Sequence, residues 1–279
     1  MLKNLLFTHG REAYRRNTYL IMYMFYKNII LVIPVFVFGW FSLFGGTYIY
    51  SNIFLDLYNV MITAIPIIWF AVFDWEHPKD TLLNCPKLYA IGLHDVFFNT
   101  TAFWRWFSYA VWQGILICLI VVYTFSNTAI TDGQSAGLTL EGNYMFYMIV
   151  MVVNVKVLIS SFEYTFWMLF WIALSLLGYY IFFMLFSFAI MSSDMYGLMQ
   201  QTFVMSQNYL VLAFFVFCYI IIDEGLQMAN AEVRNFLHIK RQQIERKKAQ
   251  MIKKDETLEK DRISNFVSKL FVLINLLLL

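Results

Sequence analysis

The chain has 279 residues, of which 61% are hydrophobic, 20% are aromatic and 14% are charged, with a formal net charge of +2. A soluble domain has about a quarter charged and about half apolar residues, so this composition excludes a soluble globular protein and predicts a multi-pass membrane protein. Three scattered cysteines and four histidines form no disulfide framework and no metal-ligand spacing, and nothing indicates a nucleic-acid partner.

The N-terminal segment, residues 1–17, is basic and has no apolar core of its own. It carries Lys3, His9, Arg11, Arg15 and Arg16. A secretory signal peptide needs an apolar core and a small-residue cleavage site. The sequence therefore predicts a cytoplasmic N-terminal segment rather than a signal peptide.

Six apolar segments of near-spanning length follow. About 20 apolar residues cross the hydrocarbon core of a bilayer, and a spanning segment of this kind must be helical because every backbone polar group needs an internal partner. The sequence thus predicts an all-α membrane protein with a six-helix transmembrane bundle within residues 18–228, and its spans are expected at about 18–44, 53–73, 103–125, 144–162, 166–190 and 207–224.

The distribution of positive charge predicts the orientation of these spans. The linkers 45–52, 126–143 and 191–206 contain no Lys or Arg, whereas the N-terminus, the 74–102 loop and the C-terminal tail hold nearly all of them. Cytoplasmic loops carry an excess of Lys and Arg. Both termini are therefore expected in the cytoplasm, although the sequence does not distinguish the plasma membrane from an endomembrane such as the Golgi or the endosome.

The last segment, residues 229–279, is predicted to be a cytoplasmic helical tail with an apolar end. Between Lys240 and Lys254 it has seven basic residues and one acidic residue, Glu245. A polybasic helix of this kind is attracted to anionic lipid, but a solvated helix without a partner fits equally well. The final stretch, Phe266–Leu279, is too short for a confident span.

Lys27 is the most informative single residue. It lies about nine residues into the apolar run Thr18–Phe44, directly before Asn28. A lysine at membrane depth costs a few kcal/mol, so it is rarely incidental. Its long side chain either extends so that the ammonium reaches the nearer membrane–water interface, or it belongs to a polar pathway through the bundle. Lys156, in the fourth span, is explained by the same extension or by pairing with Glu163 or Asn154.

A series of short motifs then becomes informative because of its order. It runs His9-Gly10-Arg11, Tyr26-Lys27-Asn28, Leu57-Tyr58-Asn59-Val60, Thr63-Ala64-Ile65-Pro66, Phe73-Asp74, Pro86-Lys87-Leu88-Tyr89, Phe98-Asn99, Phe103-Trp104 and Asn154-Val155-Lys156. In this order and spacing, over about residues 5–228, the chain resembles the C-terminal membrane half of phospholipid-flipping P-type ATPases. Its six spans are similar to the fifth to tenth of the ten spans in that family.

The resemblance implies roles for four residues. Lys27 and Asn28 would line the path of the lipid headgroup, and Tyr58 and Asn59 would contribute to it. A lysine ammonium offers three donors to a phosphate, and an amide can donate or accept. The alternatives are that Asn28 and Asn59 form interhelical hydrogen bonds, and that Tyr58 is an interfacial aromatic residue. Pro34 and Pro66 are expected to bend their helices and free backbone carbonyls, which polar neighbours can satisfy.

The catalytic part of that family is not recognisable in the chain. The phosphorylated motif Asp-Lys-Thr-Gly-Thr is absent from the 279 residues, so this chain alone is not expected to hydrolyse ATP, and no catalytic residue is assigned. The resemblance implies that ATP and Mg²⁺ bind to a catalytic half outside it, or to a partner that supplies one.

The first functional hypothesis is therefore the lipid-translocation part of a phospholipid-transporting ATPase that moves lipid toward the cytoplasmic leaflet. Its expected partners are phospholipid, the membrane, the catalytic half and an accessory membrane subunit; the headgroup is not specified. The alternative is a non-catalytic multi-pass scaffold or subunit derived from that family. An unrelated channel or carrier is disfavoured because the halves show no inverted repeat.

Overall fold

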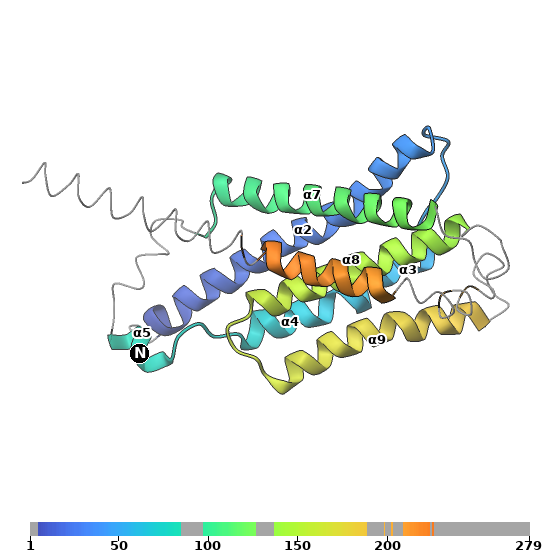
Figure 1. Ribbon diagram of the computed structural model, residues 1–279. Helices are drawn as coiled ribbons and strands as arrows, with labels where there is room; N and C mark the ends of the chain where they lie inside the picture. Colours follow the sequence, from blue (N-terminus) through green and yellow to red (C-terminus); the bar gives the residue numbers. More distant parts are fainter. Residues whose placement is uncertain are drawn as a thin grey trace, which may run out of the picture. The chain divides into compact units, whose positions relative to one another are not determined.

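The structure is a computed structural model that describes residues 5–84, 97–126, 137–188, 198, 202, 209–223 and 225. All regular secondary structure in these residues is helical (Figure 1). The elements are η1 (Leu5–Gly10), α2 (Arg11–Phe41), α3 (Asn52–Leu57), η2 (Tyr58–Ile62), α4 (Ala64–Phe73), α5 (Lys79–Asn84), α7 (Thr100–Ser126), α8 (Leu138–Ser160), α9 (Phe166–Phe188) and a helix over Tyr209–Asp223.

The predicted all-α membrane bundle is confirmed. Within the described residues, five helical stretches are long and apolar enough to cross a membrane, and they correspond to the first five predicted spans. The first helix begins before the apolar run at Thr18, because η1 and α2 continue it back to Leu5. The sixth predicted span, 207–224, is represented by the shorter apolar helix Tyr209–Asp223, and the tail 229–279 lies outside the described residues.

Helix α8 is the centre of the bundle. The chain divides into two compact units after Phe217, and the first unit contains all elements from η1 to α9. Within it, α2 runs along α7, while α8 contacts α2, α4, α7 and α9 (Figure 1). A helix that is apolar on all sides is expected to be buried, and α8 is buried over most of its circumference. A Cβ on Gly142 would lie 2.0 Å from the carbonyl oxygen of Ile49, so only glycine allows this close approach.

The second span is interrupted where its helix meets Pro66. Proline has no N–H, so Pro66 cannot donate to the carbonyl of Ile62 one turn earlier. The hydroxyl of Ser175, on α9, donates to that carbonyl instead. Immediately after the wide turn η2, the backbone N–H of Thr63 donates to the Tyr58 carbonyl at 3.1 Å. The expectation that a polar neighbour satisfies a freed carbonyl is confirmed at Pro66.

We expect Ser175→Ala to destabilise the bundle by about 1–3 kcal/mol, because it leaves the buried Ile62 carbonyl without this donor. The same change removes an acceptor of the Asn154 side-chain amide, which donates to Ser175 Oγ at 3.1 Å. Thermal unfolding of the purified chain in detergent would measure the loss. Ser108→Ala is the matched control, because exposed Ser108 only donates to Trp104 of its own helix. Equal unfolding temperatures for the two variants would contradict the assigned role of Ser175.

Candidate functional site

Lys27 points into the bundle. Its side chain lies on the inner face of α2 and is 2% exposed. The ammonium donates a 2.9 Å hydrogen bond to Thr63 Oγ1 and lies 5.8 Å from the centre of the Tyr58 ring. A lysine that extends to the interface would place its ammonium in water, so that interpretation is wrong for Lys27. The structure places the cation at the interruption of the second span.

Three hydrogen bonds connect Lys27, Thr63 and Tyr58 to one another. Thr63 Oγ1 donates in turn to the Tyr58 carbonyl at 2.7 Å, and the Tyr58 hydroxyl donates to the Lys27 carbonyl at 2.8 Å. Tyr58 is fully buried and packs edge-to-face on Phe146 with ring centres 5.6 Å apart. Tyr58 therefore belongs to the interior of the protein, and the interpretation as an interfacial aromatic residue is wrong.

The Lys27 ammonium keeps unused hydrogen-bonding capacity. Of its three donors, one is directed to Thr63, and across the described parts of the chain no carboxylate pairs with it. A buried cation beside a neutral hydroxyl can bind an anionic oxygen such as that of a phosphate. The geometry thus supports binding of an anion.

The two predicted asparagines lie elsewhere. Asn28 and Asn59 are exposed, and neither side chain makes a hydrogen bond within the described residues. The structure therefore brings Lys27 and Tyr58 together but leaves Asn28 and Asn59 on the outer face of the chain. The interhelical hydrogen bonds considered for these two amides are not formed between the described helices.

Three buried polar side chains of this region were given no role from the sequence. Thr63 holds the ammonium, Gln113 on α7 accepts a hydrogen bond from the hydroxyl of Tyr26, and Ser175 contacts the interrupted span. Each lies within an otherwise apolar predicted span, which is the signal that could have indicated it. Buried polar groups are normally hydrogen-bonded, so a polar residue in such a run predicts a partner on a neighbouring helix.

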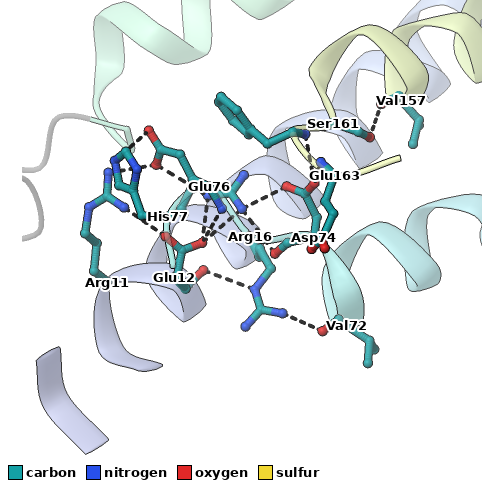
Figure 2. Close-up of polar contacts among 12 residues, drawn as sticks. Arg11, Glu12, Arg16, Val72, Asp74, Glu76, His77, Val157, Ser161 and Glu163 are labelled. Atoms are coloured by element: carbon teal, nitrogen blue, oxygen red, sulfur yellow. Dashed lines mark hydrogen bonds and ion pairs between the residues drawn. The ribbon is translucent and has the colours of Figure 1, made fainter. Parts of the chain in front are cut away.

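An ion cluster lies at the end of the bundle where α2 begins and α4 ends (Figure 2). Arg15 binds Asp74 at 2.8 Å and Glu12 at 3.0 Å, while Arg11 binds Glu12 at 2.8 Å and Glu76 at 2.7 Å. All of these side chains except Glu76 are more than nine-tenths buried. The N-terminal basic residues Arg11 and Arg15 are therefore part of the packed bundle.

Asp74 is the residue that joins three segments in this cluster. Its Oδ2 accepts from Arg15, and its Oδ1 accepts from the backbone N–H groups of Phe162 at 2.9 Å and Glu163 at 3.1 Å. These two N–H groups belong to the short connection between α8 and α9 (Figure 2). A single carboxylate thus ties the start of α2 and the end of α4 to the α8–α9 turn.

Lys156 is also buried, at 3% exposure. Its ammonium lies 5.3 Å from the ring centre of Trp106 and 5.6 Å from that of Tyr109. Such cation–π contacts stabilise a desolvated cation by about 2 kcal/mol. Glu163, one of the two partners considered for Lys156, is exposed in the turn after α8. The structure therefore places aromatic rings beside this second buried lysine.

No metal centre is found in the part of the chain that the structure describes, because no group of three His, Cys, Asp or Glu residues gathers there. The close partners of Lys27 are a hydroxyl group and an aromatic ring. These contacts suit the passage or binding of a charged group better than covalent chemistry.

Comparisons with known proteins identify the relatives of this chain. One family model, described as phospholipid-translocating P-type ATPase C-terminal, matches residues 1–235. Phospholipid-transporting ATPase 6 of Arabidopsis thaliana is 34% identical over 165 residues, which are 59% of this chain and 13% of that protein. Phospholipid-transporting ATPase IH of Mus musculus is 31% identical over 189 residues, which are 63% of this chain and 16% of that protein. The chain thus spans only a small part of the length of these relatives.

Proposed function

Since the chain belongs to the phospholipid-translocating P-type ATPase C-terminal family, we propose that it forms the lipid-translocating membrane part of a pump that moves phospholipid toward the cytoplasmic leaflet. The observation that carries this proposal is the Lys27 ammonium, which is buried and hydrogen-bonded to a neutral hydroxyl. A charge at membrane depth is costly, and the phosphate of a passing headgroup would offset that cost.

Asn28 and Asn59 have a distinct role in this proposal. Both are exposed on the helices that carry the buried pair Lys27 and Tyr58. An amide that faces hydrocarbon without a partner is unfavourable. These amides therefore contact either the headgroup outside the buried pair or the part of the longer relatives that this chain does not contain.

The energy for transport comes, in this proposal, from outside the chain. The relatives are several times longer, and the chain covers 13% of phospholipid-transporting ATPase 6. ATP and Mg²⁺ would bind to a catalytic half supplied by a longer polypeptide or by a partner. Both termini would then lie in the cytoplasm, on the side where ATP is available, and an accessory membrane subunit would complete the assembly.

The transcript upstream of the Met1 codon tests this proposal. An in-frame segment that encodes an aspartyl-phosphate motif is the expected result. An in-frame stop codon would instead favour the non-catalytic scaffold or a catalytic half supplied by a partner. The functional test is ATP turnover of the complete polypeptide in vesicles with and without phospholipids of defined headgroup, and the expected result is stimulation by at least one of them.

Asn59→Leu in that complete polypeptide is expected to lower lipid-stimulated ATP turnover about two- to tenfold, the effect of one lost hydrogen bond. The unfolding temperature should not change, because the side chain is exposed and makes no hydrogen bond within the described residues. Asn52→Leu is the matched control, since Asn52 is also exposed and begins the same interrupted span. Identical lipid stimulation in the two variants would remove Asn59 from the path.

A further inference from the structure

A cavity lies among aromatic side chains of the first unit, in the opposite half of α8 from the ion cluster. Its lining includes Asn143, Tyr144 and Tyr147 of α8, Tyr180 of α9, and Leu212 of the helix Tyr209–Asp223. The empty space is about 440 Å³, a figure that includes the open space at the mouth of the cavity. A ligand would therefore insert one end into the cavity and lie partly outside it.

One polar group of a residue that lines this cavity lacks a partner. The Nδ2 atom of Asn143 is buried and makes no hydrogen bond, and Asn143 as a whole is 6% exposed. The backbone carbonyl of the same residue is already satisfied, because it accepts a 2.9 Å hydrogen bond from the Tyr179 hydroxyl. A buried donor without an acceptor costs about 1–3 kcal/mol. A ligand oxygen that accepts from Asn143 would remove that cost.

The walls of the cavity define the rest of the ligand. None of the described residues that line it carries a formal charge, so a phosphate or carboxylate would be desolvated without a counter-charge. Flat rings form much of the wall: Tyr179 stacks on Phe183 at an interplanar angle of 9°, and Tyr147 stacks on Tyr179 at 28°. Such walls suit an uncharged, largely apolar molecule with one oxygen-bearing end.

We propose that this cavity is a binding site for an uncharged membrane lipid with a free hydroxyl group, a sterol or a diacylglycerol, whose oxygen accepts a hydrogen bond from Asn143. Both molecules have this chemistry and both reach the site from the bilayer. The site is separate from Lys27, because it lies between α8, α9 and the helix Tyr209–Asp223, whereas the Lys27 contacts join α2 to the second span. Its occupancy does not depend on the proposed transport function.

Photolabelling of the full 279-residue chain in phosphatidylcholine nanodiscs tests the proposal. The probes are a photoactivatable sterol and a photoactivatable diacylglycerol, and mass spectrometry locates the labelled peptides. We expect label on the peptides that contain Tyr147 or Tyr180, and we expect excess unlabelled lipid of the same kind to remove it. The probe that labels this site identifies the source of the hydroxyl group.

Two substitutions close the site by different routes. Asn143→Leu removes the unpartnered donor at nearly constant volume, and Leu212→Trp fills the space from a half-buried position. Each is expected to lower labelling of these peptides about fivefold. Asn143→Leu removes one hydrogen bond to the ligand, and Leu212→Trp removes the space that the ligand would occupy. Leu210→Trp is the matched control, because Leu210 lies on the same helix at 72% exposure and should leave labelling unchanged.

Three outcomes would contradict the proposal that an uncharged lipid binds in this cavity. Labelling that persists in both Asn143→Leu and Leu212→Trp would show that the probes bind elsewhere. Displacement by phosphatidylserine as effective as displacement by the unlabelled neutral lipid would show that the cavity does not select an uncharged end. Absence of label from both probes in the wild-type chain would exclude both sources.

Discussion

Lys27→Ala in a complete pump that contains this membrane domain is expected to lower lipid-stimulated ATP turnover about 30-fold or more. Truncating one partner of a buried, hydrogen-bonded charge pair costs about 2–5 kcal/mol, and each 1.4 kcal/mol corresponds to about tenfold in affinity or rate. Lys27 is 2% exposed, and within the described residues its ammonium donates only to Thr63, so truncation removes the charge that the proposal pairs with the phosphate. The measurement is ATP turnover in vesicles as a function of phospholipid content.

Two further variants separate loss of the charge from loss of the fold. Lys27→Met keeps most of the side-chain volume and should be as defective as Lys27→Ala. Lys156→Met removes a second buried lysine, whose ammonium packs on the rings of Trp106 and Tyr109, and should keep its lipid stimulation per folded molecule. Unchanged stimulation in Lys27→Met would remove Lys27 from the transport path, while a loss of equal size in both methionine variants would assign the effect to packing.

Asp74→Asn is expected to destabilise the bundle by about 3–5 kcal/mol, the cost of breaking a buried ion pair by removing one charge. Asp74 is 2% exposed and holds Arg15 at 2.8 Å while it accepts the N–H groups of Phe162 and Glu163. The neutral amide would leave the Arg15 charge undercompensated and would weaken the link to the α8–α9 turn. Thermal unfolding of the chain in detergent, monitored by tryptophan fluorescence, would detect this loss.

The control for this prediction is a carboxylate in the same turn. Glu163 is exposed, so Glu163→Gln should change the unfolding temperature little. If Asp74→Asn and Glu163→Gln unfold at the same temperature, Asp74 does not hold these segments together.

The candidate site could be predicted only in part from the sequence, and neighbouring residues show why. Lys27 and Asn28 are adjacent in the same motif, yet Lys27 is buried and Asn28 is exposed. Successive residues of a helix are about 100° apart around its axis, so a short motif does not show which of its members face the interior: Tyr26 and Lys27 are both buried, whereas Asn28 is exposed. The same holds for Tyr58, which is buried, and Asn59, which is exposed.

By itself, the sequence determined the fold class and the position of five helices long and apolar enough to cross a membrane, and it singled out Lys27 as a candidate site residue. These features follow from local physical constraints, because hydrocarbon requires long apolar helices and makes an isolated charge costly. Only the tertiary structure decided which groups meet. The Lys27–Thr63 bond joins residues 36 positions apart, the Ser175–Ile62 bond joins residues 113 positions apart, and Asp74 reaches a turn 88 positions away. Such contacts depend on how each helix is rotated and which helix it packs against, and a local pattern of apolar and polar residues does not specify either.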